Sequence, residues 1–461
     1  MSVRPEGAGE DVPEIEGVPD DPGCGWGPPE GSSWLRGQGG APMAGWLLFE
    51  RAIRFGVAFA VGAAVARHLG VDSFGNLSRA LALAGLFGFI SGLGLDTILK
   101  RDLVAYPEDR RELLATAFWM RILGACVGLV VLVAASWVIM DNTSDRVTTL
   151  VAGLPMVGTP FLVIDLDLQA QLRGRTVAAA QFCGTLASAL WRIALIMLEA
   201  PLVWFAASLA VEVLVIVIVL CAGTPGGTLS GMTKRPRLRV ARRLMSEAWP
   251  LIVAGGAIGL YLRIDQVMLA QLRGANDTGV YAAAVRLSEL GNPVAVILAS
   301  ALLPGLVRAQ KSRRLEAAAR RAFALAAIAA IALAILGTLA APVVVPLCFG
   351  RAFVDSVPVF MILVWSNVLV FTGVIRSQVL AARSSPRFLM TAACSGAVVN
   401  ILLNLWWVPV AGPIGAAWAT LVGYAFAAWL STLFWGPVRD VGRWQTSGLF
   451  LPWRALRRSS L

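Results

Sequence analysis

The chain has 461 residues, of which 57% are hydrophobic and only 15% are charged. A soluble domain of this composition lacks the polar residues needed to cover its surface, whereas a bilayer requires about 20 apolar residues for each spanning helix. The formal net charge of +11 does not indicate nucleic-acid binding, because most of it lies in gaps between apolar segments, where anionic lipid headgroups explain it better. The composition excludes a large soluble catalytic domain and predicts an all-α polytopic membrane protein.

The first 43 residues differ from the rest of the chain. They contain eight acidic residues against two arginines, Arg4 and Arg36, with many Gly and Pro residues and no apolar periodicity. Such a segment cannot bury enough apolar surface to offset the entropy cost of ordering it. We expect residues 1–43 to form a disordered acidic cytoplasmic tail.

Twelve long apolar segments follow, and each is long enough to cross a bilayer as a helix. A basic cytoplasmic linker, 223–246, separates an amino-terminal six-helix bundle (44–222) from a carboxy-terminal one (247–436), and 437–461 is a cytoplasmic tail. The predicted spans are 44–68, 74–96, 113–140, 147–168, 176–199, 201–222, 247–271, 279–307, 320–349, 355–382, 386–409 and 412–436.

Lys and Arg residues are concentrated in every second gap between these spans. The gaps 97–112, 169–175, 223–245, 308–321 and 383–387 hold 20 of them, whereas the six intervening gaps, counted with the span ends beside them, hold only Arg67, Arg146, Arg273 and Arg351. Cationic loops are retained on the cytoplasmic face of a membrane. The pattern therefore predicts a multi-pass protein of the cell (inner or plasma) membrane with both termini in the cytoplasm.

The two sets of six spans contain a short repeated pattern. The segment 69–75 (LGVDSFG) separates the first two spans, and 272–279 (LRGANDTG) separates the seventh and eighth. Both have Leu, Gly, Asp and a second Gly in that order, and they differ by one residue in length. Because the copies occupy the same place in each half, they indicate the parallel internal repeat that is common in transporters.

Apart from the arginines at span ends that were counted above, the spans contain eight arginines and fewer acidic residues. In lipid each arginine would cost about 2.5–3.5 kcal/mol on insertion scales, so these side chains should face a watery interior or an acidic partner. A cavity with excess guanidinium groups suits an anion, phosphate in particular. The candidate pathway residues are Arg54, Arg79, Arg121, Arg192, Arg263, Arg286 and Arg376, and the candidate coupling or pairing acids are Asp165, Asp265 and Glu289.

Simpler roles are open for several polar residues in the spans. Arg286 and Glu289 stand three residues apart and can neutralise one another on one helix face. Arg54 is close to a span boundary, as is Arg51, and can reach the headgroups. For Asn400 and Asn404, a hydrogen bond to a neighbouring helix is favoured over a place in the pathway.

Metal and catalytic chemistry find little support in the sequence. His68 is the only histidine, and the six cysteines are scattered without a CxxC pair. No phosphate-binding glycine-rich motif and no HExxH sequence is present. We expect no metal site, no cofactor and no catalytic residues.

Three stretches carry a resemblance to a known family. The first is 67–75 (RHLGVDSFG), with 92–95 (GLGL) and Arg101 beyond it. The second contains 249–251 (WPL), 261–269 (YLRIDQVML), 279–284 (GVYAAA) and Pro304, and the third contains 349–353 (FGRAF), 399–404 (VNILLN) and 412–420 (GPIGAAWAT). On these stretches, residues 44–436 resemble the multidrug/oligosaccharidyl-lipid/polysaccharide exporter superfamily, specifically its polysaccharide (O-antigen) flippases.

This resemblance implies a fold and a function. It implies two six-helix bundles arranged as a V, and a cargo of polyprenyl-pyrophosphate-linked oligosaccharide that is turned from the cytoplasmic to the outer leaflet by alternating access. Membrane lipids are the expected surroundings, and polysaccharide synthesis proteins are candidate partners of the 1–43 tail and the basic linker. Replacing Arg192 or Arg376 with Ala is expected to abolish export.

Two other classes are open. A multidrug or small-molecule cation antiporter of the same superfamily shares the twelve spans, but its cavity should be acidic and aromatic. A membrane glycosyltransferase or ligase should have a large outer loop with catalytic residues, and every predicted outer loop here is short.

Overall fold

The structure is a computed structural model that describes residues 40–140, 142–224, 231–232, 234–311, 315–381 and 386–450. Its regular elements in these ranges are helices, without a strand. The expected disordered tail lies almost wholly outside the described residues, which begin at Gly40. The chain forms two units: residues 1–49, which contribute the first turns of α1, and residues 50–461, which hold the other helices.

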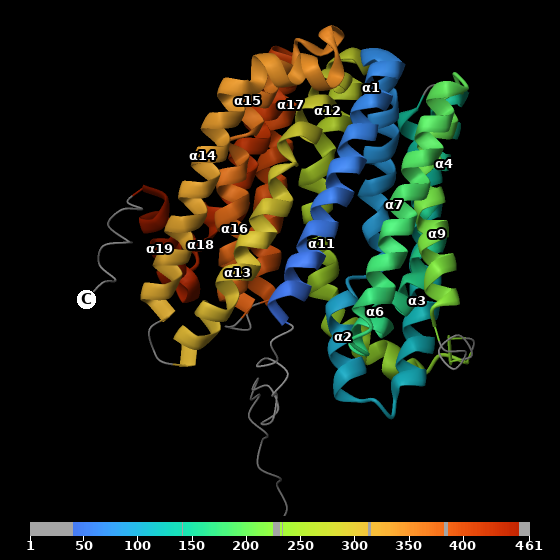
Figure 1. The fold of residues 1–461 in the computed structure, drawn as a ribbon, viewed down its shortest axis with the longest axis vertical. Coiled ribbons are helices and arrows are strands. Elements are labelled where there is room, and N and C mark those ends of the chain that lie inside the picture. Colours follow the sequence, from blue (N-terminus) through green and yellow to red (C-terminus); the bar gives the residue numbers. More distant parts are fainter. Residues whose placement is uncertain are drawn as a thin grey trace, which may run out of the picture. The chain divides into compact units, whose positions relative to one another are not determined.

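The first half of the chain, α1 to α9, supplies the first six spans (Figure 1). Its fourth span is broken into short pieces at Pro155 and Pro160, because proline removes a backbone donor and clashes with the preceding turn of a helix. The elements are α1 (Gly40–Gly92), α2 (Asp96–Ala105), α3 (Arg110–Ile139), α4 (Thr143–Gly153), α5 (Pro155–Gly158), the 3₁₀ turn η2 (Thr159–Leu162), α6 (Val163–Ala170), α7 (Gly174–Met197), α8 (Leu202–Ala206) and α9 (Ser208–Ala222).

The second half, α11 to α19, supplies the other six spans. Its elements are α11 (Leu238–Leu272), α12 (Ala275–Ser288), α13 (Gly291–Lys311), α14 (Leu315–Phe349), η3 (Arg351–Phe353), α15 (Ser356–Leu363), α16 (Ser366–Ala381), α17 (Pro386–Ala425), the π-helical turn η4 (Phe426–Leu430), α18 (Ser431–Phe434), η5 (Gly436–Val438) and α19 (Arg439–Phe450).

The predicted twelve spans are confirmed. The described residues contain ten helical stretches long and apolar enough to cross a membrane. Two of these, Arg54–Ala105 with 52 residues and Phe388–Phe434 with 47, far exceed one bilayer crossing. They are bent at Gly70 and Gly412, where φ is +73° and +55°, a conformation that favours glycine. Each therefore holds two spans.

Two helices extend beyond the predicted boundaries. The seventh span begins at Leu238, so the basic segment 238–246, expected to be a linker, forms the first turns of α11. A helix, α19, occupies part of the expected carboxy-terminal tail and packs its buried Val441 and Trp444 against α14 and α16. In both cases amphipathic residues extend the helical structure beyond the apolar run by which the spans were predicted.

The internal repeat is visible where the two halves meet. We call the end of the helices at which α2 is joined to α3 the basic end, and the opposite end, at which α11 is joined to α12, the glycine end (Figure 1). Gly70 and Gly274 share an unusual conformation, with φ of +73° and +95° and ψ of 174° and −173°. Equivalent residues of the repeat thus make equivalent breaks between consecutive helices.

Candidate functional site

A cavity of about 470 Å³ lies between the two halves. Helix α1 lines one side of it, α7 adds Arg192, and α11 and α12 line the other side. The cavity is within the size range of small-molecule sites in proteins. Polar side chains on its wall include Ser78, Gln266 and Asn292.

Three of the predicted arginines line this cavity together. Arg192 comes from the first half, and Arg263 and Arg286 come from the second. None of the three makes an ion pair or a side-chain hydrogen bond with a described residue. Glu289 is the only acid among the described lining residues, so this part of the wall carries a net positive charge.

Glycines of α1 allow two of these arginines to approach the opposite half. A Cβ added at Gly62 would lie 3.1 Å from an Nη atom of Arg286, and one added at Gly85 would lie 2.6 Å from Cζ of Arg263. Arg286 also stacks over the ring of Phe74, with its Cζ 4.6 Å from the ring centroid. This cation–π contact fixes the guanidinium without neutralising its charge.

Arg286 and Glu289 do not neutralise each other directly. The simple alternative for this pair was an ion pair on one helix face, yet the ion pairs of the described residues do not include them. Helix α12 ends at Ser288 and α13 begins at Gly291, two residues before Pro293. Glu289 therefore lies in the break between these helices, and both side chains line the cavity.

The other predicted residues are not among those that line this cavity, and each has a protein partner elsewhere, although the Nε atoms of Arg79, Arg121 and Arg376 are buried without a hydrogen bond. Arg79 pairs with Asp145 at 2.5 Å, and Arg121 pairs with Asp96. The remaining three are accounted for by contacts within the helix packing: Arg54 donates to Gln181 Oε1 at 3.1 Å, Arg376 donates to Ser431 Oγ at 3.3 Å, and Asp165 accepts from Gln169 at 3.0 Å.

Asp265 belongs to a separate buried polar cluster. Its side chain is 2% exposed and accepts hydrogen bonds from Tyr281 Oη at 2.8 Å, from Asn404 Nδ2 at 2.6 Å and from Thr420. The Asn404 bond crosses from α17 to α11, as the favoured role of this residue predicted. Asn400 beside it is buried, with neither side-chain polar atom bonded.

A second, small cavity lies beside this cluster and shares part of its wall with the main one. It measures about 30 Å³, and its wall includes Asp265, Tyr281, Thr420 and Glu289. Glu289 and Asn292 line both cavities. A space of this size holds one water molecule or one small ion, and it lies between Glu289 and Asp265.

Metal-ligand clusters of three or more His, Cys, Asp or Glu are absent from the described residues. The expectation that no metal is bound stays a prediction. The sequence did not single out the glycines Gly62 and Gly85, although they set how closely Arg286 and Arg263 approach α1. A glycine in an apolar span has many uses, and only the facing helix reveals which one applies.

Solved structures of low sequence identity share this fold. The lipid II flippase MurJ, in an inward closed conformation, matches with a TM-score of 0.66 and 12% identity over 89% of this chain and 92% of that one. A multidrug resistance MATE family transporter of the MOP superfamily, in an inward-facing conformation, matches with a TM-score of 0.66 and 16% identity over 86% and 98%. An outward-facing conformation of such a transporter matches with a TM-score of 0.57 and 14% identity over 89% and 96%.

Sequence comparison identifies the family. No curated protein matches the sequence. A family model described as polysaccharide biosynthesis protein matches residues 44–310, which is more than half of the chain. The chain belongs to the polysaccharide biosynthesis protein family and has the fold of the multidrug/oligosaccharidyl-lipid/polysaccharide exporter superfamily.

Proposed function

We propose that the chain is a flippase that moves a polyprenyl-pyrophosphate-linked oligosaccharide from the cytoplasmic to the outer leaflet, for the synthesis of a surface polysaccharide. The observation that carries this proposal is the set of three arginines around one cavity, Arg192, Arg263 and Arg286, none of which forms an ion pair with a described acid. Guanidinium groups bind phosphate oxygens through paired N–H donors, and a pyrophosphate offers several such oxygens.

The placement of these arginines suits alternating access. Arg192 belongs to the first half, and Arg263 and Arg286 belong to the second. A relative movement of the halves therefore changes how many of these arginines contact one anion. The pyrophosphate and the nearest sugars occupy the cavity, while the polyprenyl tail stays in the surrounding lipid. The fold shared with a lipid II flippase supports a lipid-linked cargo.

The orientation follows from the charged loops. The basic end, rich in Lys and Arg, faces the cytoplasm together with both termini, and the glycine end faces outward. Because the cytoplasm is electrically negative, moving each negative charge of the cargo outward is favourable by about 2.3 kcal/mol per 100 mV of membrane potential. The membrane potential thus favours export of an anion.

Glu289 and Asp265 are the acids placed to couple transport to a cation or proton. Glu289 lies on the wall of the arginine cavity, and the small cavity extends from it to Asp265. A bound anion raises the affinity of these acids for a cation or proton. By linkage, a cation or proton bound at the acids raises the affinity of the arginines for the anionic cargo.

A cation antiporter of the same superfamily is the alternative. The fold alone permits it, because a MATE transporter shares this fold. Its cargo would have to enter a cavity whose wall carries three arginines and one acid, and like charges repel strongly where little water is present. The relatives in fold are transporters rather than enzymes, and no step of the proposal requires a catalytic residue.

The deciding experiment measures lipid-linked saccharides and surface polysaccharide in cells with and without the gene. Accumulation of one pyrophosphate-linked oligosaccharide, together with loss of its surface polymer, supports the flippase and names its cargo. An unchanged lipid pool with altered sensitivity to cationic drugs supports the antiporter instead.

A further inference from the structure

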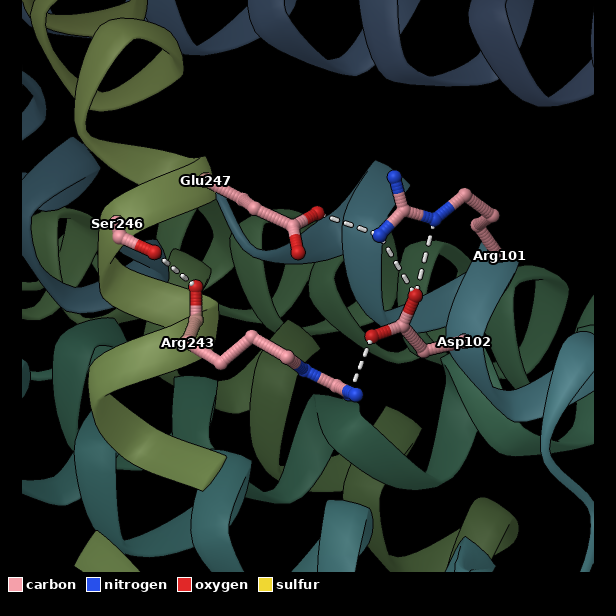
Figure 2. Close-up of polar contacts among 5 residues, drawn as sticks. All are labelled: Arg101, Asp102, Arg243, Ser246 and Glu247. Atoms are coloured by element: carbon pink, nitrogen blue, oxygen red, sulfur yellow. Dashed lines mark hydrogen bonds and ion pairs between the residues drawn. The ribbon is translucent and has the colours of Figure 1, made fainter. Parts of the chain in front are cut away.

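A network of four charged side chains joins the two halves at the basic end (Figure 2). Asp102 of α2 accepts from Arg101 Nε at 2.9 Å and from Arg243 of α11 at 2.8 Å. Arg101 also reaches across to Glu247 of α11 at 2.5 Å. Asp102 is 2% exposed, whereas Arg101, Arg243 and Glu247 are 48%, 44% and 36% exposed. One buried carboxylate is thus held by solvent-accessible partners from both halves.

Apolar contacts lie beside this network. Leu95 and Ile98 of the first half pack against Leu244 and Ala248 of α11, and all four are buried. Gly94 brings the chain close to α11 here, since an added Cβ would lie 3.1 Å from the backbone nitrogen of Ile252. The first turns of α11 therefore rest on the first half of the chain.

Further along, α11 also packs on the second half. Ala257 packs with Ala393 and Ala397 of α17, and Tyr261 meets Tyr424 with ring centroids 5.3 Å apart. Asn404 of α17 adds its hydrogen bond to Asp265. One helix is thus attached to α2 by its first turns and to α17 by its later ones.

A weak point in α11 lies between these two attachments. Pro250 is inside the helix and removes the backbone donor that would bond to the carbonyl of Ser246. One turn earlier, Ser246 Oγ bonds to the carbonyl of Arg243, a contact that bends helices (Figure 2). The helix can therefore change its angle between the network and the α17 contact.

We propose that Arg101, Asp102, Arg243 and Glu247 form an ionic latch that holds the basic end closed and opens when the two halves part. The proposal rests on the alternating access of the proposed function. Arg243 and Glu247 reach solvent and can exchange their partners on α2 for water, while the buried Asp102 keeps its bond to Arg101 of its own helix. Pro250 lets the first turns of α11 swing away from α2 while its later turns stay on α17.

The latch differs from the contact at the glycine end. There the halves meet through glycine backbones, with Gly75 against Ala275 and Gly279 against Val71. That contact depends on close backbone approach, and the latch depends on charge. Substitutions that change the charges of the latch should therefore separate the two halves at the basic end and leave the glycine end closed.

A charge-swap experiment tests the latch. Spin labels are placed at the exposed positions Val104 of α2 and Met245 of α11, in a protein whose native cysteines are replaced. R101E sets two acids of α2 against Glu247, and E247R sets two arginines of α11 against Arg101. Combining R101E with E247R puts both acids on α2 and both arginines on α11.

The distance between the labels should lengthen in R101E and in E247R and return to its original value in the double variant. R320E is the matched control, because the ion-pair partner of Arg320, Glu316, lies one turn away on the same helix, α14. Unchanged distances in both single variants would overturn the latch. Equal lengthening in R320E, or no return in the double variant, would also overturn it by showing general loosening.

The test separates the latch from the proposed function. The label distances require no cargo, so they report the latch even for a protein that carries a different lipid. An unchanged pool of lipid-linked saccharides in cells without the gene would reject the flippase and leave the distance result standing.

Discussion

Gly75 of α1 packs directly against the carbonyl oxygen of Ala275, and the reverse contact is made by Gly279 with Val71. An added Cβ would lie 1.9 Å from the Ala275 oxygen and, at Gly279, 2.1 Å from the Val71 oxygen. Val71 and Gly75 occupy the same places in the first repeat as Ala275 and Gly279 in the second, counted from Gly70 and Gly274. The two repeats therefore close the glycine end by a reciprocal contact that only glycine permits.

The replacement Gly75→Val should keep the glycine end from closing. The cavity would then open to reagents on that side, because Ser78 lies one turn along α1 and lines it. We expect Ser78→Cys to react with a membrane-impermeant thiol reagent faster in the Gly75→Val background. Gly56→Val is the control, since an added Cβ at Gly56 meets nothing within 4 Å. Equal reaction rates in both backgrounds would contradict the glycine contact as the closure.

The contact between Gly85 and Arg263 gives a second prediction. A methyl group at Gly85 would lie within 2.6–2.7 Å of three guanidinium atoms, so Gly85→Ala must displace Arg263 from its place in the cavity. One charge-assisted hydrogen bond contributes about 1.5 kcal/mol or more, and its loss lowers transport about tenfold. The measurement is the rate of cargo movement in reconstituted vesicles.

Gly88→Ala supplies the comparison for that prediction. Gly88 lies on the same helix, and an added Cβ there meets nothing within 4 Å. Its replacement should leave the rate unchanged, because alanine favours the helix and touches no neighbour. A loss of rate as large in Gly88→Ala as in Gly85→Ala would show that the spacing of α1 and Arg263 is irrelevant.

The sequence predicted the spans well, because a bilayer leaves few alternatives to apolar helices of about 20 residues. The repeat was equally accessible, since Gly70 and Gly274 are constrained by backbone conformation. Helix ends were less predictable. The segment 238–246 is polar enough to look like a linker, yet its Leu244 packs on the first half and extends α11.

The candidate site was only partly predictable. Intramembrane arginines can be recognised in a sequence, but their partners come from distant positions. Arg79 and Asp145 are 66 residues apart, and Arg110 and Asp167 are 57 apart. Sequence therefore could not separate paired arginines from those of the cavity. The Arg101–Asp102–Arg243–Glu247 network went unnoticed for the same reason, since it joins residues about 140 positions apart.

The cluster around Asp265 gives a third prediction, on stability. Replacing Asp265 with Ala would leave the buried donors of Tyr281, Thr420 and Asn404 without their acceptor. Each buried group left unpaired costs about 1–3 kcal/mol. Asp265→Ala should lower the midpoint of thermal unfolding more than Asp265→Asn, which retains one acceptor oxygen.

Asp72→Asn is the control for this comparison. Asp72 is exposed in the connection between the first two spans, so its replacement should leave the unfolding midpoint unchanged. Equal midpoints for Asp265→Ala and the unaltered protein would show that the hydrogen bonds of the cluster contribute nothing to the fold.

The three cavity arginines give the last prediction, on charge and geometry separately. Arg286→Gln removes the charge and should lower cargo transport about ten- to a hundredfold, because a charged hydrogen bond contributes about 1.5–3 kcal/mol. Arg286→Lys keeps the charge but loses the planar fork and the stacking on Phe74, so transport should fall to an intermediate rate. The same order is expected at Arg192 and Arg263.

Arg320→Gln controls for loss of a positive charge outside the cavity, since Arg320 pairs with Glu316 on α14. Its rate should equal that of the unaltered protein. The proposal that the cavity binds an anion would be contradicted by full transport in all three Gln variants, at Arg192, Arg263 and Arg286. Equal loss in the Gln and Lys variants would show that the guanidinium geometry matters and that charge alone does not suffice. The pattern of rates thus distinguishes a site that grips phosphate oxygens from one that only attracts an anion.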